Sequence, residues 1–189
     1  MRVITGVAKG RRLYAVPGQS TRPVTDRVKV SLFNILAGGL EDARFLDLFA
    51  GTGGVGIEAL SRGAAEAVFV ERDERALATI RRNIELTRLG DRAHIVRRDV
   101  FKFLAGYSGE PFDYVYVAPP QYQGVWSQTV KLLDGSPLVT AGGLVIAQIH
   151  PREYLPLELT HLALSDQRKY GSTMLCFYEA RGDSSLFGR

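Results

Sequence analysis

A glycine-rich turn between a short apolar run and an amphipathic segment constrains this chain more than any other stretch. The sequence FLDLFAGTGGVGIEALSRG, residues 45–63, predicts a strand, a turn and a helix in that order. The turn contains Gly51, Gly53, Gly54 and Gly56, which leave room for a ligand against the backbone, and the following helix presents unpaired N–H groups. We therefore expect a ligand to bind at this turn.

Strand-like runs alternate with helical patterns along the body of the chain. We expect strands at residues 45–49, 66–70, 93–97, 112–117 and 143–149, with helices after the first, second and fourth. The clearest helical pattern has Leu77, Ile80 and Ile84 on one face, with Asp73 as its N-terminal cap and Gly90 at its end. The last two runs, ALSDQRKYGS and TMLCFYEA, have no helix between them and predict an antiparallel hairpin.

The predicted fold class is therefore α/β, with a doubly wound, Rossmann-like sheet that is mostly parallel and ends in the antiparallel hairpin. Residues 1–40 predict a basic N-terminal extension made of a small β-hairpin around Lys9 and Gly10 followed by a helix. Thr25 or Asp26 would cap this helix, and its expected apolar stripe contains Val28, Leu32, Ile35 and Leu36. We expect the main domain to cover residues 41–182 and residues 183–189 to form a flexible tail.

Positive charge is concentrated near the N-terminus. Residues 1–30 carry a formal charge of +6 against +4 for the whole chain of 189 residues, so the remainder carries −2. A cationic segment of this kind is typical of proteins that bind a phosphate-rich partner, and a solvated basic face explains it equally well. Charge alone leaves the two interpretations open.

Several classes of protein are disfavoured by composition. No run of about 18 apolar residues is present, and the N-terminus lacks the apolar region of a secretion signal, so we expect a cytoplasmic protein. The single cysteine, Cys176, excludes an internal disulfide and is expected to be a buried thiol. The three histidines, His94, His150 and His161, are scattered, and we assign them no metal or catalytic role.

Four polar or turn-forming positions follow successive predicted strands, where a doubly wound sheet binds its ligands. Asp47 precedes the glycine turn, Glu71 and Asp99 follow the second and third strands, and Ala118-Pro119-Pro120-Gln121-Tyr122 follows the fourth. The glycine spacing also matches the dinucleotide fingerprint, which is a weak signal by itself, and a fixed carboxylate at Asp47 disfavours a diphosphate. The set fits adenosine joined to a charged amino acid, which indicates S-adenosylmethionine. A local turn former at Asp47, a helix-start acid at Glu71 and a helix cap at Asp99 are the alternative interpretations.

The chain resembles a known family at these residues. The body is similar to class I S-adenosylmethionine-dependent methyltransferases, and TRPVTDRVKVSLFNIL, LDLFAGTGGVGIEALSRGA, VERD and KYGST resemble the RsmD family, which methylates the exocyclic amine of a guanine in 16S ribosomal RNA. The resemblance implies that Glu71 binds the ribose, that Asp99 and Val100 bind the adenine, and that the turn with Asp47 holds the amino-acid end. The implied cofactor-binding residues are Asp47, Phe49, Gly51, Thr52, Gly53, Glu71, Arg72, Asp99, Val100 and Ala118.

The acceptor motif departs from the family pattern. Family members carry Asp or Asn before Pro-Pro-Tyr, and this chain has Ala118, which offers no side-chain acceptor to the target amine. The predicted catalytic residues are Pro119, Pro120, Gln121 and Tyr122, with Gln121 supplying an amide oxygen and Tyr122 stacking on the base. A catalytically impaired protein that binds cofactor and RNA is the first alternative, and a nucleotide-dependent oxidoreductase is the second.

The expected partner is 16S ribosomal RNA or a small-subunit assembly particle, with no membrane and no metal, and we expect a monomer. Five basic residues are predicted to contact RNA phosphates: Arg11, Arg12, Arg22, Arg27 and Lys29. Trp126, Val130 and Leu133 are expected to form the buried stripe of a helix.

Overall fold

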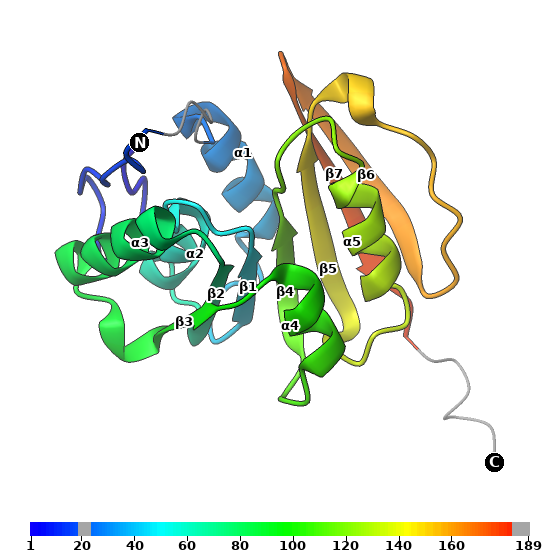
Figure 1. Ribbon diagram of the computed structural model, residues 1–189, viewed down its shortest axis with the longest axis horizontal. Coiled ribbons are helices and arrows are strands. Elements are labelled where there is room, and N and C mark those ends of the chain that lie inside the picture. The colour runs from blue at the N-terminus through cyan, green and yellow to red at the C-terminus, as the bar shows by residue number, and fades with distance from the viewer. Residues whose placement is uncertain (19–23, 183–189) are drawn as a thin grey trace. The chain divides into compact units, whose positions relative to one another are not determined.

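The computed structural model describes residues 1–18 and 24–182, and it divides into two compact units (Figure 1). The first unit covers Met1–Gly106 and the second begins at Tyr107. Each unit contains both strands and helices. The predicted boundary at residue 40 stays a prediction, and the predicted tail at residues 183–189 lies outside the described residues.

Three parallel strands form the centre of the first unit. They are β1 (Arg44–Leu48), β2 (Glu66–Glu71) and β3 (Ala93–Arg97), in the order β3-β2-β1. The register pairs Asp47 with Phe69 and Glu71 with Arg97, so the carboxyl ends of the three strands lie along one edge. This confirms the predicted strands at 45–49, 66–70 and 93–97 to within one residue.

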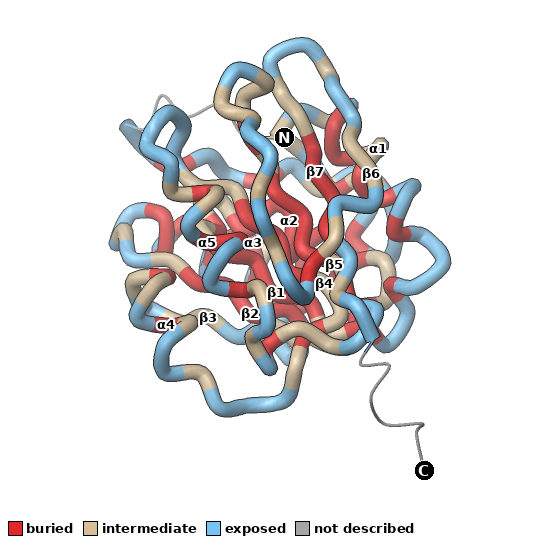
Figure 2. The backbone as a smooth tube through the Cα atoms, turned by 90° about the vertical axis from the view of Figure 1, so that its right-hand side faces the viewer, coloured by how far each residue is buried: buried red, intermediate tan, exposed pale blue. Residues whose placement is uncertain are grey.

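The described residues of this unit form the α-helices α1 (Asp26–Leu36), α2 (Gly54–Ser61), α3 (Glu74–Thr87) and α4 (Val100–Gly106). Every residue of α2 is buried, and this helix packs on β1, β2 and α3 (Figure 2). Its close approach to the sheet needs glycine at position 56, because a Cβ there would lie 2.4 Å from the ring of Phe69. The short helix α4 was not predicted.

The ends of the other helices partly follow the predictions. Thr25 caps α1 and Asp73 caps α3, as expected. The helix α3 ends earlier than predicted, at Arg88 in the left-handed conformation, and Gly90 instead begins a 3-10 turn, η1 (Gly90–Arg92). Ile35 is 40% exposed, so its assignment to the apolar stripe of α1 is wrong, and Phe33 is buried there instead.

Residues 1–18 bond to one another and also to α2 and α3. The expected hairpin is present as a short antiparallel bridge between Arg2 and Arg12, with backbone hydrogen bonds from Val3 to Arg11 and from Leu13 to Met1. The backbone N–H groups of Ile4 and Thr5 instead donate to Glu58 of α2, at 2.8 and 3.0 Å. Because these groups bond to a side chain, they are not available to extend a β-ladder.

The strands of the second unit lie in the order β4-β5-β7-β6, with both parallel and antiparallel neighbours. Its elements are β4 (Phe112–Val117), α5 (Val125–Leu133), β5 (Val139–Ile149), the 3-10 turn η2 (Pro151–Glu153), β6 (Leu162–Tyr170) and β7 (Thr173–Ala180). The strands β4 and β5 are parallel, and β7 is antiparallel to both β5 and β6. The C-terminal hairpin is therefore confirmed, and Trp126 is buried on α5 as predicted.

Candidate active site

The turn after β1 has a strained backbone and is held by buried side chains. Phe49 has φ 61° and Gly53, the residue before α2, has φ 74°. The left-handed conformation costs a non-glycine residue about 1–2 kcal/mol, so neighbouring contacts must stabilise Phe49. Asp47 is 2% exposed, and its Oδ2 accepts a hydrogen bond of 3.0 Å from the backbone N–H of Gly56.

Glu71 connects this turn to the end of β2. Its Oε2 accepts from the backbone N–H of Gly51 at 3.0 Å, and its Oε1 accepts from those of Arg72 and Asp73 at 2.8 and 3.0 Å. Oε1 already accepts two hydrogen bonds, whereas Oε2 accepts one and has a further lone pair that can accept a hydroxyl donor. The structure therefore brings together Asp47, the glycine turn and Glu71, as the sequence predicted.

Asn83 of α3 is a third support of the turn, and the sequence analysis missed it. The side chain is fully buried, and its Nδ2 donates to the backbone carbonyls of Thr52 at 2.9 Å and Tyr14 at 3.1 Å. Its Oδ1 accepts from the backbone N–H of Tyr14 at 2.7 Å. The sequence places Asn83 on the same helical face as the apolar residues Ile80 and Ile84. A buried amide needs hydrogen-bond partners, so this position was the signal that could have indicated its role.

Burial determines the electrostatics of Asp47. Removal from water raises the pKa of this carboxyl group to about 8, and the negative charge of Glu71 adds to the rise, whereas the Gly56 N–H opposes it. A cation bound nearby would favour the ionised form. The turn therefore suits a positively charged group better than a phosphate.

Arg72, Asp99 and Val100 lie together at the ends of β2 and β3. Arg72 is exposed, and its Nη1 donates to Asp99 Oδ2 at 3.1 Å. Asp99 Oδ1 accepts from the backbone N–H groups of Phe101 at 3.0 Å and Lys102 at 3.3 Å, so Asp99 also caps α4. Val100 is buried, with 4% of its surface exposed. The alternative interpretation of Asp99 as a helix cap is confirmed.

The predicted acceptor residues follow β4 in the second unit. Ala118 and Pro119 are half-buried, and Pro120, Gln121 and Tyr122 are exposed. Tyr122 has φ 60° and is 63% exposed. The side chain of Gln121 and the ring of Tyr122 are thus open to a large substrate.

Two residues beyond β5 contact this loop, and the sequence analysis assigned neither of them a role. The backbone N–H of Tyr122 donates to Glu153 Oε1 at 2.6 Å. The ring of Tyr122 lies 5.5 Å from that of His150, with an interplanar angle of 41°. Pro151 begins the 3-10 turn η2, Glu153 ends it, and His150 is its N-terminal cap. A proline in the first turn with a glutamate soon after is the sequence signal that could have indicated this capped turn.

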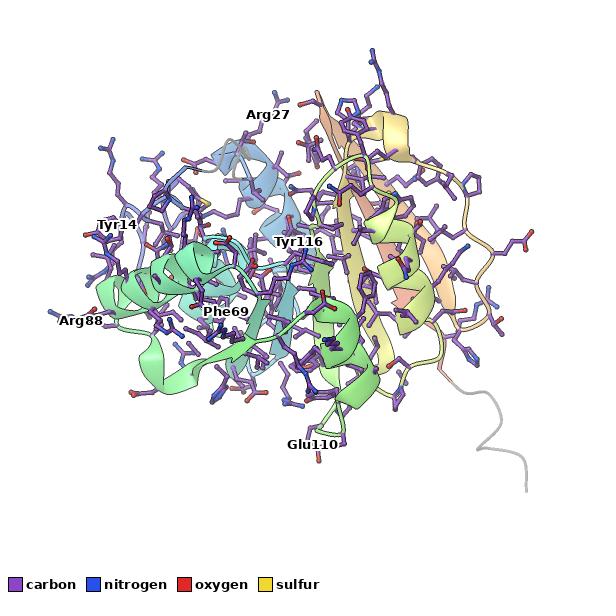
Figure 3. All side chains as sticks on the ribbon, in the orientation of Figure 1. Tyr14, Arg27, Phe69, Arg88, Glu110 and Tyr116 are labelled. Carbon is purple, nitrogen blue, oxygen red and sulfur yellow. The ribbon has the colours of Figure 1, made fainter. Side chains whose placement is uncertain are left out.

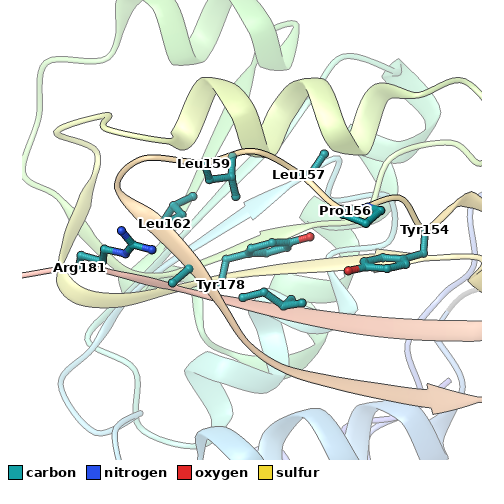
Figure 4. Close-up of a pocket in the computed structure, with 9 residues that line it drawn as sticks. Tyr154, Pro156, Leu157, Leu159, Leu162, Tyr178 and Arg181 are labelled. Atoms are coloured by element: carbon teal, nitrogen blue, oxygen red, sulfur yellow. The ribbon is translucent and has the colours of Figure 1, made fainter.

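A separate cavity of about 340 Å³ opens elsewhere in the second unit (Figure 4). It is lined mainly by apolar residues of the segment that leads into β6, together with Tyr178 and Arg181. The hydroxyl group of Tyr178 is buried there without a hydrogen-bond partner, and burial raises its pKa above the ordinary value. None of the predicted acceptor residues lines this cavity.

The predicted RNA-binding residues fall into different environments. Arg12 and Arg27 are exposed, and Figure 3 shows Arg27 extending away from the fold. Arg11 is half-buried and donates to the carbonyl of Leu86. Arg22 lies outside the described residues. Lys29 is fully buried and its Nζ lies 3.1 Å from Glu58 Oε2, so its predicted contact with RNA is wrong.

The described part of the chain holds no group of three side chains that could bind a metal ion. Within residues 1–18 and 24–182, none of the helices combines the length and the hydropathy that a membrane span requires.

Comparison with known proteins agrees with this arrangement. The family model "Conserved hypothetical protein 95" matches residues 1–179. The YlbH protein of Bacillus subtilis is 39% identical over 96% of this chain and 100% of its own length. Ribosomal RNA small subunit methyltransferase D of Escherichia coli is 34% identical over 97% of this chain and 93% of its own.

A solved structure supports the predicted fold class. The yhhF protein of Escherichia coli superposes with a TM-score of 0.85 at 32% identity, covering 96% of this chain and 98% of its own. The fold class is thus the doubly wound, Rossmann-like α/β fold of class I methyltransferases. The family model and the near full-length relatives place this chain in the RsmD family of methyltransferases.

Proposed function

We propose that this protein transfers a methyl group from S-adenosylmethionine to the exocyclic amine of a guanine in small-subunit ribosomal RNA. The observation that carries the proposal is the turn after β1, where Glu71 accepts from the Gly51 N–H and Asp47 accepts from the Gly56 N–H. Family membership and the name of the Escherichia coli relative support the reaction and the class of RNA.

The residues of the turn fit this cofactor. A Cβ placed at Gly51 would have no neighbour closer than the Phe49 carbonyl at 3.9 Å, so space is open beside the backbone. Glu71 Oε2 would accept from a ribose hydroxyl. Asp47, ionised when the cationic cofactor binds, would supply negative charge near the amino-acid end. Asp99 with Val100 would hold the adenine. When bound, S-adenosylmethionine would supply an electrophilic methyl group on a positively charged sulfur. The exocyclic amine would bond to the methyl carbon as the carbon–sulfur bond breaks, which leaves S-adenosylhomocysteine, and the amine would release a proton to solvent.

The acceptor loop would orient the guanine. The Pro119 carbonyl and the Gln121 amide oxygen would accept hydrogen bonds from the exocyclic amine, which directs the nitrogen lone pair to the methyl group. The ring of Tyr122 would stack on a base taken out of its helix. Ala118 supplies no acceptor, so Gln121 takes the place of the missing side-chain oxygen.

Methyl transfer to unmethylated small subunits tests the proposal. With labelled cofactor, Gln121→Ala and Tyr122→Ala should each lower the rate, and Gln123→Ala should serve as a matched control because Gln123 is a nearby exposed glutamine. Equal rates in all variants would eliminate the rebuilt acceptor site. Calorimetry should detect binding of S-adenosylhomocysteine, and binding of NAD alone would instead favour an oxidoreductase.

Ala118 favours a second candidate function, which is the binding of cofactor and RNA without methyl transfer. This candidate predicts S-adenosylhomocysteine binding and small-subunit binding with no incorporation of label. Incorporation that disappears when Glu71 is replaced would exclude it.

A further inference from the structure

We propose that Glu153 is a positioning residue that fixes Tyr122 for stacking on the target base. The proposal rests on the proposed function, in which Tyr122 provides the stacking plane. Glu153 lies in η2 after β5, whereas Tyr122 lies in the loop after β4. Because β4 and β5 are parallel neighbours, with Val117 opposite Ala147, the two segments leave the same edge of the sheet.

The carboxylate of Glu153 bonds to both segments at once. Its Oε1 accepts from the backbone N–H of Tyr122 at 2.6 Å, and its Oε2 accepts from the backbone N–H of His150 at 3.2 Å. A carboxylate has an acceptor oxygen for each of these donors. Glu153 therefore ties the acceptor loop to the end of β5.

His150 supports one side of the Tyr122 ring. The two ring centroids are 5.5 Å apart, and His150 Nδ1 accepts from the backbone N–H of Arg152 at 3.1 Å, which fixes the orientation of the imidazole. The Tyr122 side chain nevertheless stays 63% exposed. A ring that is supported by a neighbour and still open to solvent is prepared to stack on a base.

The backbone of Tyr122 explains why the tie is needed. Its φ of 60° is unfavourable for a residue with a side chain, so the loop depends on contacts that select this conformation. Without Glu153 the residue would relax toward negative φ, and the ring would leave His150. The preorganised stacking plane would then be lost, while the cofactor turn, whose contacts lie in the first unit, would not change.

Steady-state methyl transfer to unmethylated small subunits tests the role of Glu153. Glu153→Ala should lower kcat/KM for the subunit about tenfold, mainly through KM, with unchanged affinity for S-adenosylhomocysteine. Glu153→Gln should retain part of the activity, because its amide oxygen can accept from only one of the two segments. Glu158→Ala is the control, since Glu158 is exposed in the same segment, and it should match the wild type.

A double-mutant cycle separates positioning from a direct RNA contact. In a Tyr122→Ala background, Glu153→Ala should have no further effect on kcat/KM, because its target is already absent. The proposal would be overturned if Glu153→Ala lowered kcat/KM about tenfold in both the wild-type and the Tyr122→Ala backgrounds. It would also be overturned if Glu153→Ala alone caused no loss. Protection of the Tyr122 amide against hydrogen exchange should also fall in Glu153→Ala, and unchanged protection would overturn the proposal even if the protein proved inactive. Failure of the proposed function alone would appear as a wild type that transfers no methyl group while its Tyr122 amide remains protected by Glu153.

Discussion

The turns after β1 and β4 each contain an aromatic residue and a glycine with positive φ, but they are held very differently. In each turn an aromatic residue has positive φ, Phe49 at 61° and Tyr122 at 60°, and a glycine with positive φ, Gly53 at 74° or Gly124 at 66°, immediately precedes a helix. The first turn leads into α2, whose residues are all buried. The second runs through residues 120–124, which are all exposed.

The number of side chains that hold each turn is the main difference. Asp47, Glu71 and Asn83 bond to the backbone of the first turn or of α2. For the second, the described contacts from outside the loop and α5 come from Glu153 and His150. A turn held at several points suits a small ligand of constant shape, whereas an exposed turn held from one side is accessible to a macromolecule. The comparison predicts that changes in the first turn affect folding and cofactor binding, and that changes in the second affect mainly the acceptor.

The largest expected effect is on the pH dependence of stability through Asp47. Its pKa is raised to about 8 in the folded protein, and the unfolded value is near 3.8. Between these values Asp47 is ionised in the unfolded chain and protonated in the folded chain. The stability that the protonated form contributes at low pH is therefore lost as the pH rises. The loss should approach about 1.4 kcal/mol per pH unit between pH 5 and 7.

Denaturant unfolding of wild type and Asp47→Asn at pH 5, 6, 7 and 8 measures this effect. The variant keeps an oxygen for the Gly56 N–H but has no titrating group at this position. The unfolding free energy of the wild type minus that of the variant should therefore fall as the pH rises. Saturating S-adenosylmethionine should flatten the wild-type dependence, because its positive charge favours ionised Asp47. Parallel curves for the two proteins would show that Asp47 is ionised throughout.

Gly56→Ala should give the next largest effect. The added Cβ would lie 2.4 and 2.9 Å from atoms of the fully buried Phe69 ring, and overpacking of this kind costs about 2–3 kcal/mol. Gly38→Ala is the control, because its Cβ would meet nothing within 4 Å. Similar midpoints for both variants in denaturant unfolding would mean that α2 moves away from the sheet at little cost.

Glu71→Ala should have a smaller effect on stability and a clear effect on binding. It removes the acceptor for the backbone N–H groups of Gly51, Arg72 and Asp73, and we expect a loss of about 1–2 kcal/mol, since water replaces part of these bonds. Affinity for S-adenosylhomocysteine, measured by calorimetry, should fall about tenfold or more with the lost ribose contacts. Glu74→Ala provides the control, because its exposed pair with Arg97 contributes less than about 1 kcal/mol.

Most of the first turn could be predicted from the sequence, and much of the second could not. Asp47, Gly51 and Glu71 were found because strand periodicity places the ends of parallel strands at one edge, and this rule needs no knowledge of side-chain contacts. The contacts of Asn83 with Tyr14 and Thr52 join segments far apart in the chain, and periodicity carries no information about such pairs.

The same limit explains Lys29 and Glu153. Lys29 was predicted to contact RNA phosphates, but Glu58 of α2 provides a buried carboxylate for it. Burial lowers the pKa of Lys29, and Glu58 opposes that shift. Glu153 contacts Tyr122 only because β4 and β5 are adjacent. Charge density along a sequence predicts neither of these pairs, since both depend on which helices and strands meet.

Gly124→Ala should give the smallest effect and tests whether the two turns are independent. Gly124 has φ 66° and open space around its Cβ position, so the cost is only that of the left-handed conformation, about 1 kcal/mol. Gly124→Asn should cost less, because asparagine tolerates this conformation better than alanine. Unfolding free energy and S-adenosylhomocysteine affinity should be measured together, and the affinity should not change in either variant. A parallel fall in cofactor affinity would show that the acceptor turn helps to shape the cofactor turn, and the two would then have to be treated as one site.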